Sequence, residues 1–258
     1  MNRAELRAAL ADGQLEMRYQ PIVRLDTGAP VGLEALARLN HPSLGILLPA
    51  VFVPQIEDAG LAAELTDRVG STAFAEMAGA AIAPLGLSVG VNLPLEVLLV
   101  PAALDRLDAQ RRTAGLDPGQ IVIELTESQP VTDLAGLRRA TQRVRAAGYR
   151  AMIDDIAPSV PLIAELMDLP FTGLKLDKAL VQALADSEAA RGFVTGTIAA
   201  AAARGLTVIA EGVEDRTTWR RMRAMGVHQA QGFLVARPLT AAEVPGWMAG
   251  WDGLSLAC

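Results

Sequence analysis

The sequence has few of the residues that cross-link a chain or bind soft metal ions. It contains one cysteine, Cys258, and two histidines, His41 and His228. One cysteine cannot form a disulfide within the chain, which fits a reducing compartment, and we expect a cytoplasmic location. The same scarcity excludes a conventional Cys/His zinc site. Any metal site must therefore use oxygen ligands, which favour Mg²⁺, Mn²⁺ or Ca²⁺.

Positive charge is also scarce, because 23 lysines and arginines face 29 aspartates and glutamates and leave a net charge of −6. This balance argues against general binding to DNA, RNA or an anionic membrane. A small anionic ligand remains open, provided that metal ions or a local arginine receive it.

No segment has the uninterrupted apolar length of a membrane span. The uncharged stretch 77–95 approaches that length, but glycines and prolines interrupt it, and we predict a helix end, a loop and a buried strand. The N-terminal segment MNRAELRAALADGQ is typical of a charged amphipathic turn and lacks the apolar centre of a signal peptide. We therefore expect neither a membrane span nor export.

What the sequence does contain is a regular alternation of short apolar runs with longer segments of helical periodicity. The predicted strands are 15–23, 30–39, 87–93, 120–127, 149–155, 173–177, 207–214 and 229–235. The predicted helices are 54–78, 102–114, 133–147, 160–168, 187–204, 215–225 and 240–249. No linker rich in glycine, proline or serine divides the chain. We therefore predict one α/β domain over residues 1–258 with a (β/α)8 TIM-like barrel fold.

One connection departs from a regular barrel. Only the six residues RLDTGA join the predicted strands 15–23 and 30–39. Parallel strands need a crossover of a dozen or more residues, so these two strands should be antiparallel. The sequence thus predicts a TIM-like barrel with an antiparallel first strand.

Seven of the eight predicted strands carry an ionisable or amide residue in an otherwise apolar segment. These residues are Glu34, Asn92, Glu124, Asp154, Asp155, Lys175, Glu211 and Gln231. Each one alone could be a solvated strand end, but active sites of such barrels lie at the carboxyl ends of the strands, where these residues would meet. Five carboxylates buried around one axis require strong cations, and two divalent ions would supply them. We interpret the set as a metal site.

Short motifs along the chain resemble those of one known family. They are YQPI at 19–22, EALAR at 34–38, NHPSLG at 40–45, PAVFVPQIE at 49–57, VNLP at 91–94, ELTES at 124–128, LKLDK at 174–178, AEGVE at 210–214 and QGFLVARP at 231–238. In this order they are similar to the motifs of EAL domains, phosphodiesterases that hydrolyse cyclic di-GMP. The match runs from about residue 15 to residue 240. The resemblance implies the same barrel, including its antiparallel first strand.

The resemblance also implies that the acidic set holds two ions of Mg²⁺ or Mn²⁺. The first would be surrounded by Glu34, Asn92, Glu124 and Asp154, and the second by Asp154, Asp155 and Glu211. A phosphodiester is stable at neutral pH, and two metal ions can activate water and stabilise the leaving oxygen. The product would be linear pGpG.

Further roles follow from the same resemblance. Glu34, Lys175 and Gln231 would be catalytic, with the last two positioning the attacking water. Lys175 would act either as general base or as a water-orienting cation.

Other matching residues would bind the substrate. The resemblance implies contacts with cyclic di-GMP from Gln20, Leu36, Arg38 and Glu214. Arg38 follows Glu34 by four residues, so on a strand both side chains point to the same face and the guanidinium can reach a phosphate oxygen.

The loop after Asp155 departs from the family pattern. Active members continue as DDFGTGYSSL, whereas this chain has DDIAPSVPLI over residues 154–163. Both glycines are replaced, and two prolines restrict the backbone and remove hydrogen-bond donors. The family's serine that partners the second glutamate of ELTES, here Glu127, falls at Pro161. We therefore expect the loop support of Glu127 to be altered.

Two functional classes remain open. The chain is either a phosphodiesterase with an altered loop, which we favour because all the expected ligands are present, or a receptor that binds cyclic di-GMP without efficient cleavage. A scaffold that ignores the nucleotide would leave Glu34, Arg38 and Glu211 together unexplained. The expected partners also include a second copy in a homodimer and, in a longer protein, a sensory or GGDEF domain.

Overall fold

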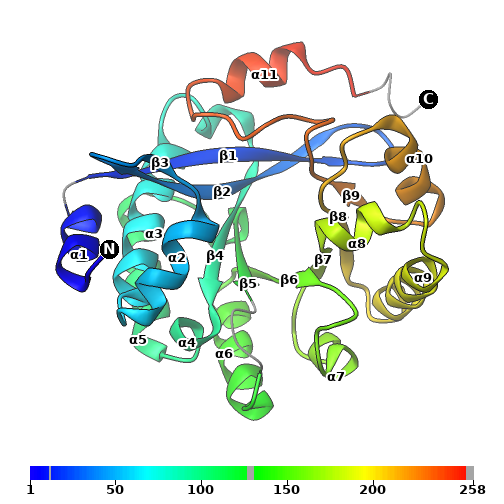
Figure 1. Cartoon of the computed structure of the whole chain (residues 1–258), viewed down its shortest axis with the longest axis horizontal. Helices are drawn as coiled ribbons and strands as arrows, with labels where there is room; N and C mark the ends of the chain where they lie inside the picture. The colour runs from blue at the N-terminus through cyan, green and yellow to red at the C-terminus, as the bar shows by residue number, and fades with distance from the viewer. Residues whose placement is uncertain (12, 127–130, 254–258) are drawn as a thin grey trace.

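The strands form one continuous sheet that closes on itself (Figure 1). The computed structural model describes residues 1–11, 13–126 and 131–253. In this part of the chain the sheet has nine strands. β1 pairs with β2, which closes the ring. β3 pairs only at the outer end of β2, so eight strands form the barrel. The strands are β1 (Leu15–Arg24), β2 (Pro30–His41), β3 (Gly45–Leu47), β4 (Ser88–Pro94), β5 (Ile121–Thr126), β6 (Arg150–Ile156), β7 (Gly173–Leu176), β8 (Thr207–Ala210) and β9 (Gln229–Ala230).

Strand direction is mixed in the way that the short first connection predicts. β1 is antiparallel to both of its neighbours, β2 and β9. The pairs from β2–β4 around to β8–β9 are parallel. The connection between β1 and β2 turns at Gly28, whose φ of +71° is a left-handed conformation that favours glycine. The predicted TIM-like barrel with an antiparallel first strand is therefore confirmed.

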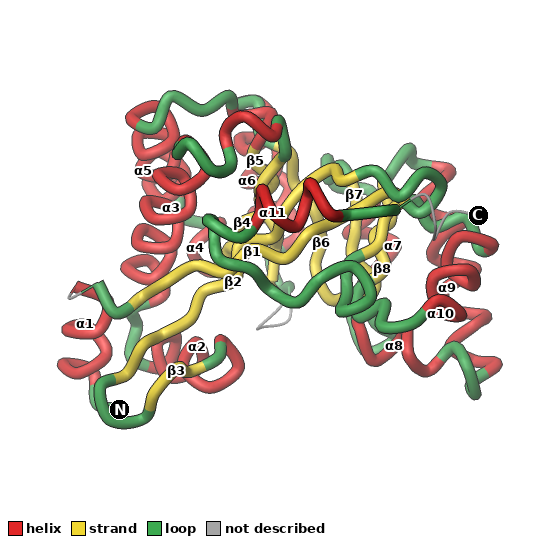
Figure 2. Tube along the Cα trace, turned by 90° about the horizontal axis from the view of Figure 1, so that it is seen from above, coloured by secondary structure: helices red, strands yellow, loops and turns green. Residues whose placement is uncertain are grey.

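Helices lie outside the ring of strands in both views (Figure 1, Figure 2). They are α1 (Arg3–Ala11), α2 (Pro49–Asp58), α3 (Ala62–Ala78), α4 (Leu95–Leu98), α5 (Pro101–Thr113), α6 (Leu134–Ala146), α7 (Ile163–Met167), α8 (Lys178–Ala183), α9 (Glu188–Ala203), α10 (Arg216–Ala224) and α11 (Val244–Gly250), with short 3₁₀ turns at Ala83–Leu85 and Pro118–Gln120. Outward-facing strand residues such as Val89, Val91, Ile121 and Ile123 belong to the main apolar core. Among the described helices, none combines the length and apolar character needed to cross a bilayer.

Several element boundaries differ from the predicted ones. The predicted helix 54–78 is two helices, α2 and α3, because the chain turns at Gly60 with a φ of +66°. The N-terminal segment, predicted as a turn, forms helix α1, and β3 and α8 were not predicted. β8 ends at residue 210 and β9 at 230, so the polar residues that follow them lie in loops at the strand ends.

An apolar layer fills the middle of the barrel. Ile22, Val122, Met152 and Ile209 are buried there together, with Val31 packed against them. Each of the first four lies two residues from a polar residue of the same chain segment. The polar residues, in the same order, are Gln20, Glu124, Asp154 and Glu211. Because side chains two apart on a strand share a face, the polar residues form the next layer of the same interior. The apolar layer therefore closes the polar layer off from the other end of the barrel.

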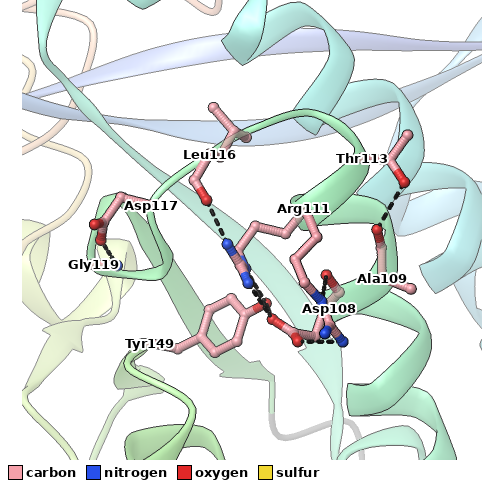
Figure 3. Close-up of polar contacts among 9 residues, drawn as sticks. Asp108, Ala109, Arg111, Thr113, Leu116, Asp117, Gly119 and Tyr149 are labelled. Atoms are coloured by element: carbon pink, nitrogen blue, oxygen red, sulfur yellow. Dashed lines mark hydrogen bonds and ion pairs between the residues drawn. The ribbon is translucent and has the colours of Figure 1, made fainter.

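A polar cluster fixes α5 against the start of β6 (Figure 3). The hydroxyl of Tyr149 donates to Asp108 Oδ1 at 2.9 Å, and Arg111 forms an ion pair with the same carboxylate at 2.8 Å. Arg111 also donates to the carbonyl oxygen of Leu116. Burial acts to raise the pKa of Asp108, but the bonds from Arg111 and Tyr149 outweigh it and hold the pKa below its usual value. This cluster lies at the amino end of β6, away from the polar layer.

Candidate metal centre

The polar layer is organised around one buried ammonium group. Lys175 on β7 is 0% exposed. Its Nζ lies 2.6 Å from Glu211, 3.0 Å from both Glu124 and Asp154, and 3.3 Å from Glu34. Four side chains from four different strands or strand ends thus meet at a single cation.

The strand register staggers these side chains from one strand to the next. Asn92 on β4 is the register partner of Glu124 on β5, and Glu34 on β2 is the partner of Gly90. A Cβ atom at position 90 would collide with the carboxylate of Glu124. Gly90 therefore makes the room in which that carboxylate sits.

Three amide side chains hold the acid of β2 in place. Gln231 Nε2 donates to Glu34 Oε2 at 2.6 Å, and Asn92 Nδ2 donates to Glu34 Oε1 at 3.0 Å. Gln231 also donates to Gln20 Oε1 at 3.0 Å, and Gln20 in turn donates to the carbonyl oxygen of Ala236 at 3.2 Å. Both oxygens of Glu34 are therefore fixed by hydrogen bonds.

The electrostatics show a shortage of positive charge. Burial alone would lower the pKa of Lys175, but the surrounding carboxylates raise it well above its usual value. Burial also acts to raise the pKa of Glu34, but Lys175 and the hydrogen bonds from Gln231 and Asn92 outweigh it and lower this pKa. By contrast, burial and neighbouring carboxylates raise the pKa of Glu124 to about 8 and raise that of Asp154 and of Glu211. One ammonium group does not neutralise this many acids.

The donor set fits divalent cations. Carboxylate oxygens of Glu34, Glu124 and Asp154 lie within 4.8 Å of one another, and so do those of Asp154, Asp155 and Glu211. Asp154 belongs to both groups, as expected of a residue between two ions. Every donor is oxygen, which Mg²⁺ and Mn²⁺ prefer, and such ions would supply the positive charge that the acids lack.

Asp155 is held in an uncommon backbone conformation. Its φ is +51°, and that of Leu162, at the other end of the same loop, is +58°. Aspartate tolerates the left-handed region better than most residues, but leucine does not. The Asp155 side chain is exposed, yet partial burial and the charge of Asp154 raise its pKa to about 6. The departure that the sequence shows in this loop is thus accompanied by unusual backbone angles at both of its ends.

Two cavities flank the acidic layer. The larger, about 560 Å³, is walled mainly by apolar residues of β2, α2 and α3, together with Asn92 and Glu57. The smaller, about 360 Å³, is lined by polar residues including Gln20, Arg38 and Glu214. Leu36, Asp154 and Asp155 line both cavities. The predicted ligand-binding residues therefore all lie in the mouth of the barrel.

Two of these residues make contacts that were not predicted. Arg38 donates to the neighbouring carbonyl oxygen of Ala37 at 2.8 Å, and it makes no ion pair with the acidic layer among the described contacts. Glu214 accepts a hydrogen bond from Lys178 at 2.6 Å instead of joining the ring around Lys175. Glu127, predicted to support the loop, lies outside the described residues.

The structure adds two residues that sequence reasoning missed, Lys178 and Phe233. Both line the smaller cavity. Phe233 is 44% exposed, and two cations lie near its ring, with Arg237 at 4.3 Å and Lys178 at 5.3 Å from the ring centroid. The sequence placed Phe233 in a strand, where it would have been a packing residue. An aromatic residue two positions after Gln231 in QGFLVARP was the available signal.

Comparisons with known proteins agree on one family. The sequence model of the family described as EAL domain matches residues 3–238. The cyclic di-GMP phosphodiesterase PA2567 of Pseudomonas aeruginosa is 32% identical over 230 residues, which cover 89% of this chain and 39% of that protein. The cyclic di-GMP phosphodiesterase RocR of the same species is 30% identical over 236 residues, which cover 92% of this chain and 60% of that protein. The chain thus spans less than two thirds of the length of both relatives.

A solved structure shows the same fold. The PaMucR phosphodiesterase, determined as a complex with c-di-GMP, superposes with a TM-score of 0.85 at 28% sequence identity. The superposition covers 93% of this chain and 98% of that chain.

Proposed function

The chain belongs to the EAL domain family, and we propose that it is a metal-dependent phosphodiesterase that hydrolyses cyclic di-GMP to linear pGpG. The observation that carries this proposal is the layer of five carboxylates at the mouth of the barrel, four of them in contact with one lysine, flanked by two cavities. EAL domains are metal-dependent, and the acidic cluster supplies suitable ligands. The relatives named above are cyclic di-GMP phosphodiesterases, which supports the choice of substrate.

We assign two ions of Mg²⁺ or Mn²⁺ to the two carboxylate groups. Glu34, Glu124 and Asp154, with the amide oxygen of Asn92, would hold one ion; Asp154, Asp155 and Glu211 would hold the other. When bound, such ions supply positive charge to the phosphodiester oxygens and make water more acidic.

The chain's own residues then position the attacking water. Lys175 is kept in its charged form by its carboxylate neighbours, so we assign it the role of a water-orienting cation. Gln231 is held by Glu34 and Gln20 and can orient the same water with its amide. The water oxygen forms a bond to phosphorus, the bond to the 3′-oxygen breaks, and that oxygen leaves with a proton as a free hydroxyl.

The two cavities suit a ligand with two halves. In the smaller cavity the exposed face of Phe233 offers a stacking surface for a guanine base, and Glu214 can accept hydrogen bonds from its N–H groups. Arg38 can turn from the carbonyl oxygen of Ala37 toward a phosphate oxygen, because a charged acceptor binds a guanidinium more strongly than a carbonyl does. The second base would enter the larger, more apolar cavity, past Leu36.

A second candidate function is a cyclic di-GMP receptor. The observation that favours it is the loop after Asp155, which has left-handed φ angles at Asp155 and Leu162 and carries Pro158 and Pro161. If this loop held Asp155 away from the second ion, the ligand would bind without efficient cleavage. Apart from Glu211, which directly follows β8, the remaining ligands and the lysine come from five strands. Strands hold a site more rigidly than loops do, so the enzyme is the better supported proposal.

The test is direct. We would incubate the purified chain with cyclic di-GMP and Mg²⁺, and separately Mn²⁺, and follow pGpG by chromatography. The proposal predicts product with the wild type and none with Glu34→Ala. Intact nucleotide under both metals, together with tight binding in a titration, would overturn the enzyme and support the receptor.

We also propose a cytoplasmic location and, in a longer protein, a linked sensory or GGDEF domain that regulates the site. The support for a linked domain is that the chain covers only 39% and 60% of the two relatives.

A further inference from the structure

The chain has only two lysines, and both lie at the mouth of the barrel. Apart from the histidines, its other basic residues are arginines. Lys175 is the buried cation of the acidic layer, and Lys178, three residues further on, lines the smaller cavity. An ammonium group is a compact charge with three donors, whereas a guanidinium is a flat fork, so the two are not interchangeable at a contact site. The chain thus uses lysine only at two positions of one site.

The helix that Lys178 begins does not explain this residue. Lys178 is the first residue of α8, directly after the N-cap Asp177, whose side chain accepts a hydrogen bond from the N–H of Leu180 at 3.0 Å. A cation at this end of a helix opposes the helix dipole. The ion pair with Glu214 is also exposed, at 49% for the lysine and 40% for the glutamate, and such a pair adds little to folding stability. The cavity therefore explains the lysine better than the fold does.

The ammonium group is held at a defined place in the smaller cavity. Gly212 has a φ of +62°, and a Cβ atom there would collide with the aliphatic stem of Lys178. The stem therefore packs on the backbone of Gly212, and its Nζ reaches Glu214 Oε1 at 2.6 Å. The same Nζ lies 5.3 Å from the centroid of the Phe233 ring. One donor and one acceptor thus lie side by side near an exposed aromatic ring.

This donor and acceptor match the pairing edge of guanine. That edge carries the carbonyl oxygen O6, which accepts, beside the N1–H group and the 2-amino group, which donate. The ammonium of Lys178 can donate to O6 while the carboxylate of Glu214 accepts from the two N–H donors. Adenine has an amino group in place of O6 and an unprotonated N1 in place of N1–H. In the same orientation adenine would turn a donor toward the ammonium and an acceptor toward the carboxylate.

We propose that Lys178 is a specificity-determining residue, which donates to guanine O6 and selects guanine over adenine in the smaller cavity. The inference rests on the proposed function, which assigns a guanine base to this cavity and its N–H groups to Glu214. The carboxylate alone does not discriminate, because it could also accept from the amino group of adenine. The ammonium adds the discrimination, because adenine's amino group would face another donor.

Calorimetric titration in a Glu34→Ala background with Mg²⁺ tests this selectivity while the nucleotide stays intact. Adding Lys178→Met should weaken the binding of cyclic di-GMP about 10- to 30-fold, as the loss of a charged hydrogen bond implies. The binding of cyclic di-AMP has no such bond to lose. The preference for cyclic di-GMP over cyclic di-AMP should therefore fall about tenfold. The variant should fold, because Lys178 is exposed and its ion pair with Glu214 is weak.

Arg237→Met is the matched control. The Arg237 guanidinium lies 4.3 Å from the centroid of the same Phe233 ring, and its described contacts do not include Glu214. The control removes one positive charge beside the ring, so it should weaken both nucleotides by a similar factor. A guanine preference that Lys178→Met leaves unchanged, or that Arg237→Met lowers as much, would overturn the proposal.

Chemical protection tests the contact itself. Lys175 is 0% exposed, so an amine-selective acetylating reagent should modify Lys178 and leave Lys175 intact, as read by mass spectrometry. Bound cyclic di-GMP should slow the modification of Lys178, and an unchanged rate at saturating nucleotide would contradict the contact.

Both measurements read binding and not cleavage. A chain that binds cyclic di-GMP without hydrolysing it would overturn the phosphodiesterase and still test the role of Lys178. Absence of binding by both the wild type and Glu34→Ala would overturn the assigned substrate and this inference with it.

Discussion

The replacement of Lys175 by methionine tests how the acidic layer is held together. Methionine has a similar length but no charge, so Lys175→Met leaves Glu34, Glu124, Asp154 and Glu211 without the ammonium group that all four contact. Among the described residues, no other cation forms an ion pair with these four carboxylates, so in EDTA the variant has no replacement for the lost charge. We therefore expect a large loss of folding stability in the metal-free variant.

The size of the loss follows from burial. Removing one partner of a buried ion pair costs about 3–5 kcal/mol, because the other charge stays buried and unpaired. Lys175 is 0% exposed and serves four carboxylates at 2.6–3.3 Å, which points to the upper end, about 5 kcal/mol. Proton uptake limits the cost, since the pKa of Glu124 is already raised to about 8. Typical domains are stable by about 5–15 kcal/mol, so the variant would be close to unfolding.

The assay is urea unfolding at pH 8 in EDTA, followed by circular dichroism. Lys178→Met is the matched control, because Lys178 is 49% exposed and has one ion pair, with Glu214 at 2.6 Å. Such a surface pair contributes less than about 1 kcal/mol. Saturating Mg²⁺ should restore part of the stability of Lys175→Met by supplying the missing charge. A loss in Lys175→Met no larger than that in Lys178→Met would refute the reasoning.

Three further perturbations have defined outcomes. Mg²⁺ or Mn²⁺ should raise the melting temperature of the wild type by several degrees, and Asp154→Ala should abolish this shift because Asp154 belongs to both carboxylate groups; an unchanged shift would rule out the assigned ligands. Asp108→Asn should cost about 1–3 kcal/mol in urea unfolding at pH 7. The folded pKa of Asp108 is depressed, so this difference should be complete above the unfolded pKa of about 3.9 and disappear as the pH falls through the folded value; a difference that grows with acid would contradict the assignment. Phe233→Ala should weaken cyclic di-GMP binding in a calorimetric titration about tenfold, as loss of a stacking surface worth about 1–3 kcal/mol implies, and unchanged affinity would exclude stacking there.

The polar layer could be predicted because its chemistry conflicts with its surroundings. Glu124, Asp154 and Lys175 stand in strands whose other residues are apolar, and such exceptions are costly unless they meet partners. Because active sites of such barrels lie at the carboxyl ends of the strands, these residues were expected at one end of the barrel. The antiparallel first strand was predictable for a similar reason, because six residues cannot make a crossover.

Other features depend on contacts that the sequence does not contain. β3 has only three residues, and its pairing with β2 is decided by the turn at residues 42–44 rather than by periodicity. Phe233 became a cavity residue because β9 ends at residue 230, which no local signal marks. The orientation of Arg38 and the pairing of Lys178 with Glu214 depend on side-chain choices among several nearby acceptors. These are tertiary outcomes, and local sequence patterns do not determine them.

The measurement that tests the central claim most directly is the metal content of the site in a crystal grown with cyclic di-GMP and Mn²⁺, read from anomalous scattering. The account predicts two manganese ions about 3.5–4 Å apart on either side of Asp154. One ion, or none, in a crystal that contains the nucleotide would contradict a two-metal phosphodiesterase and leave a receptor in its place.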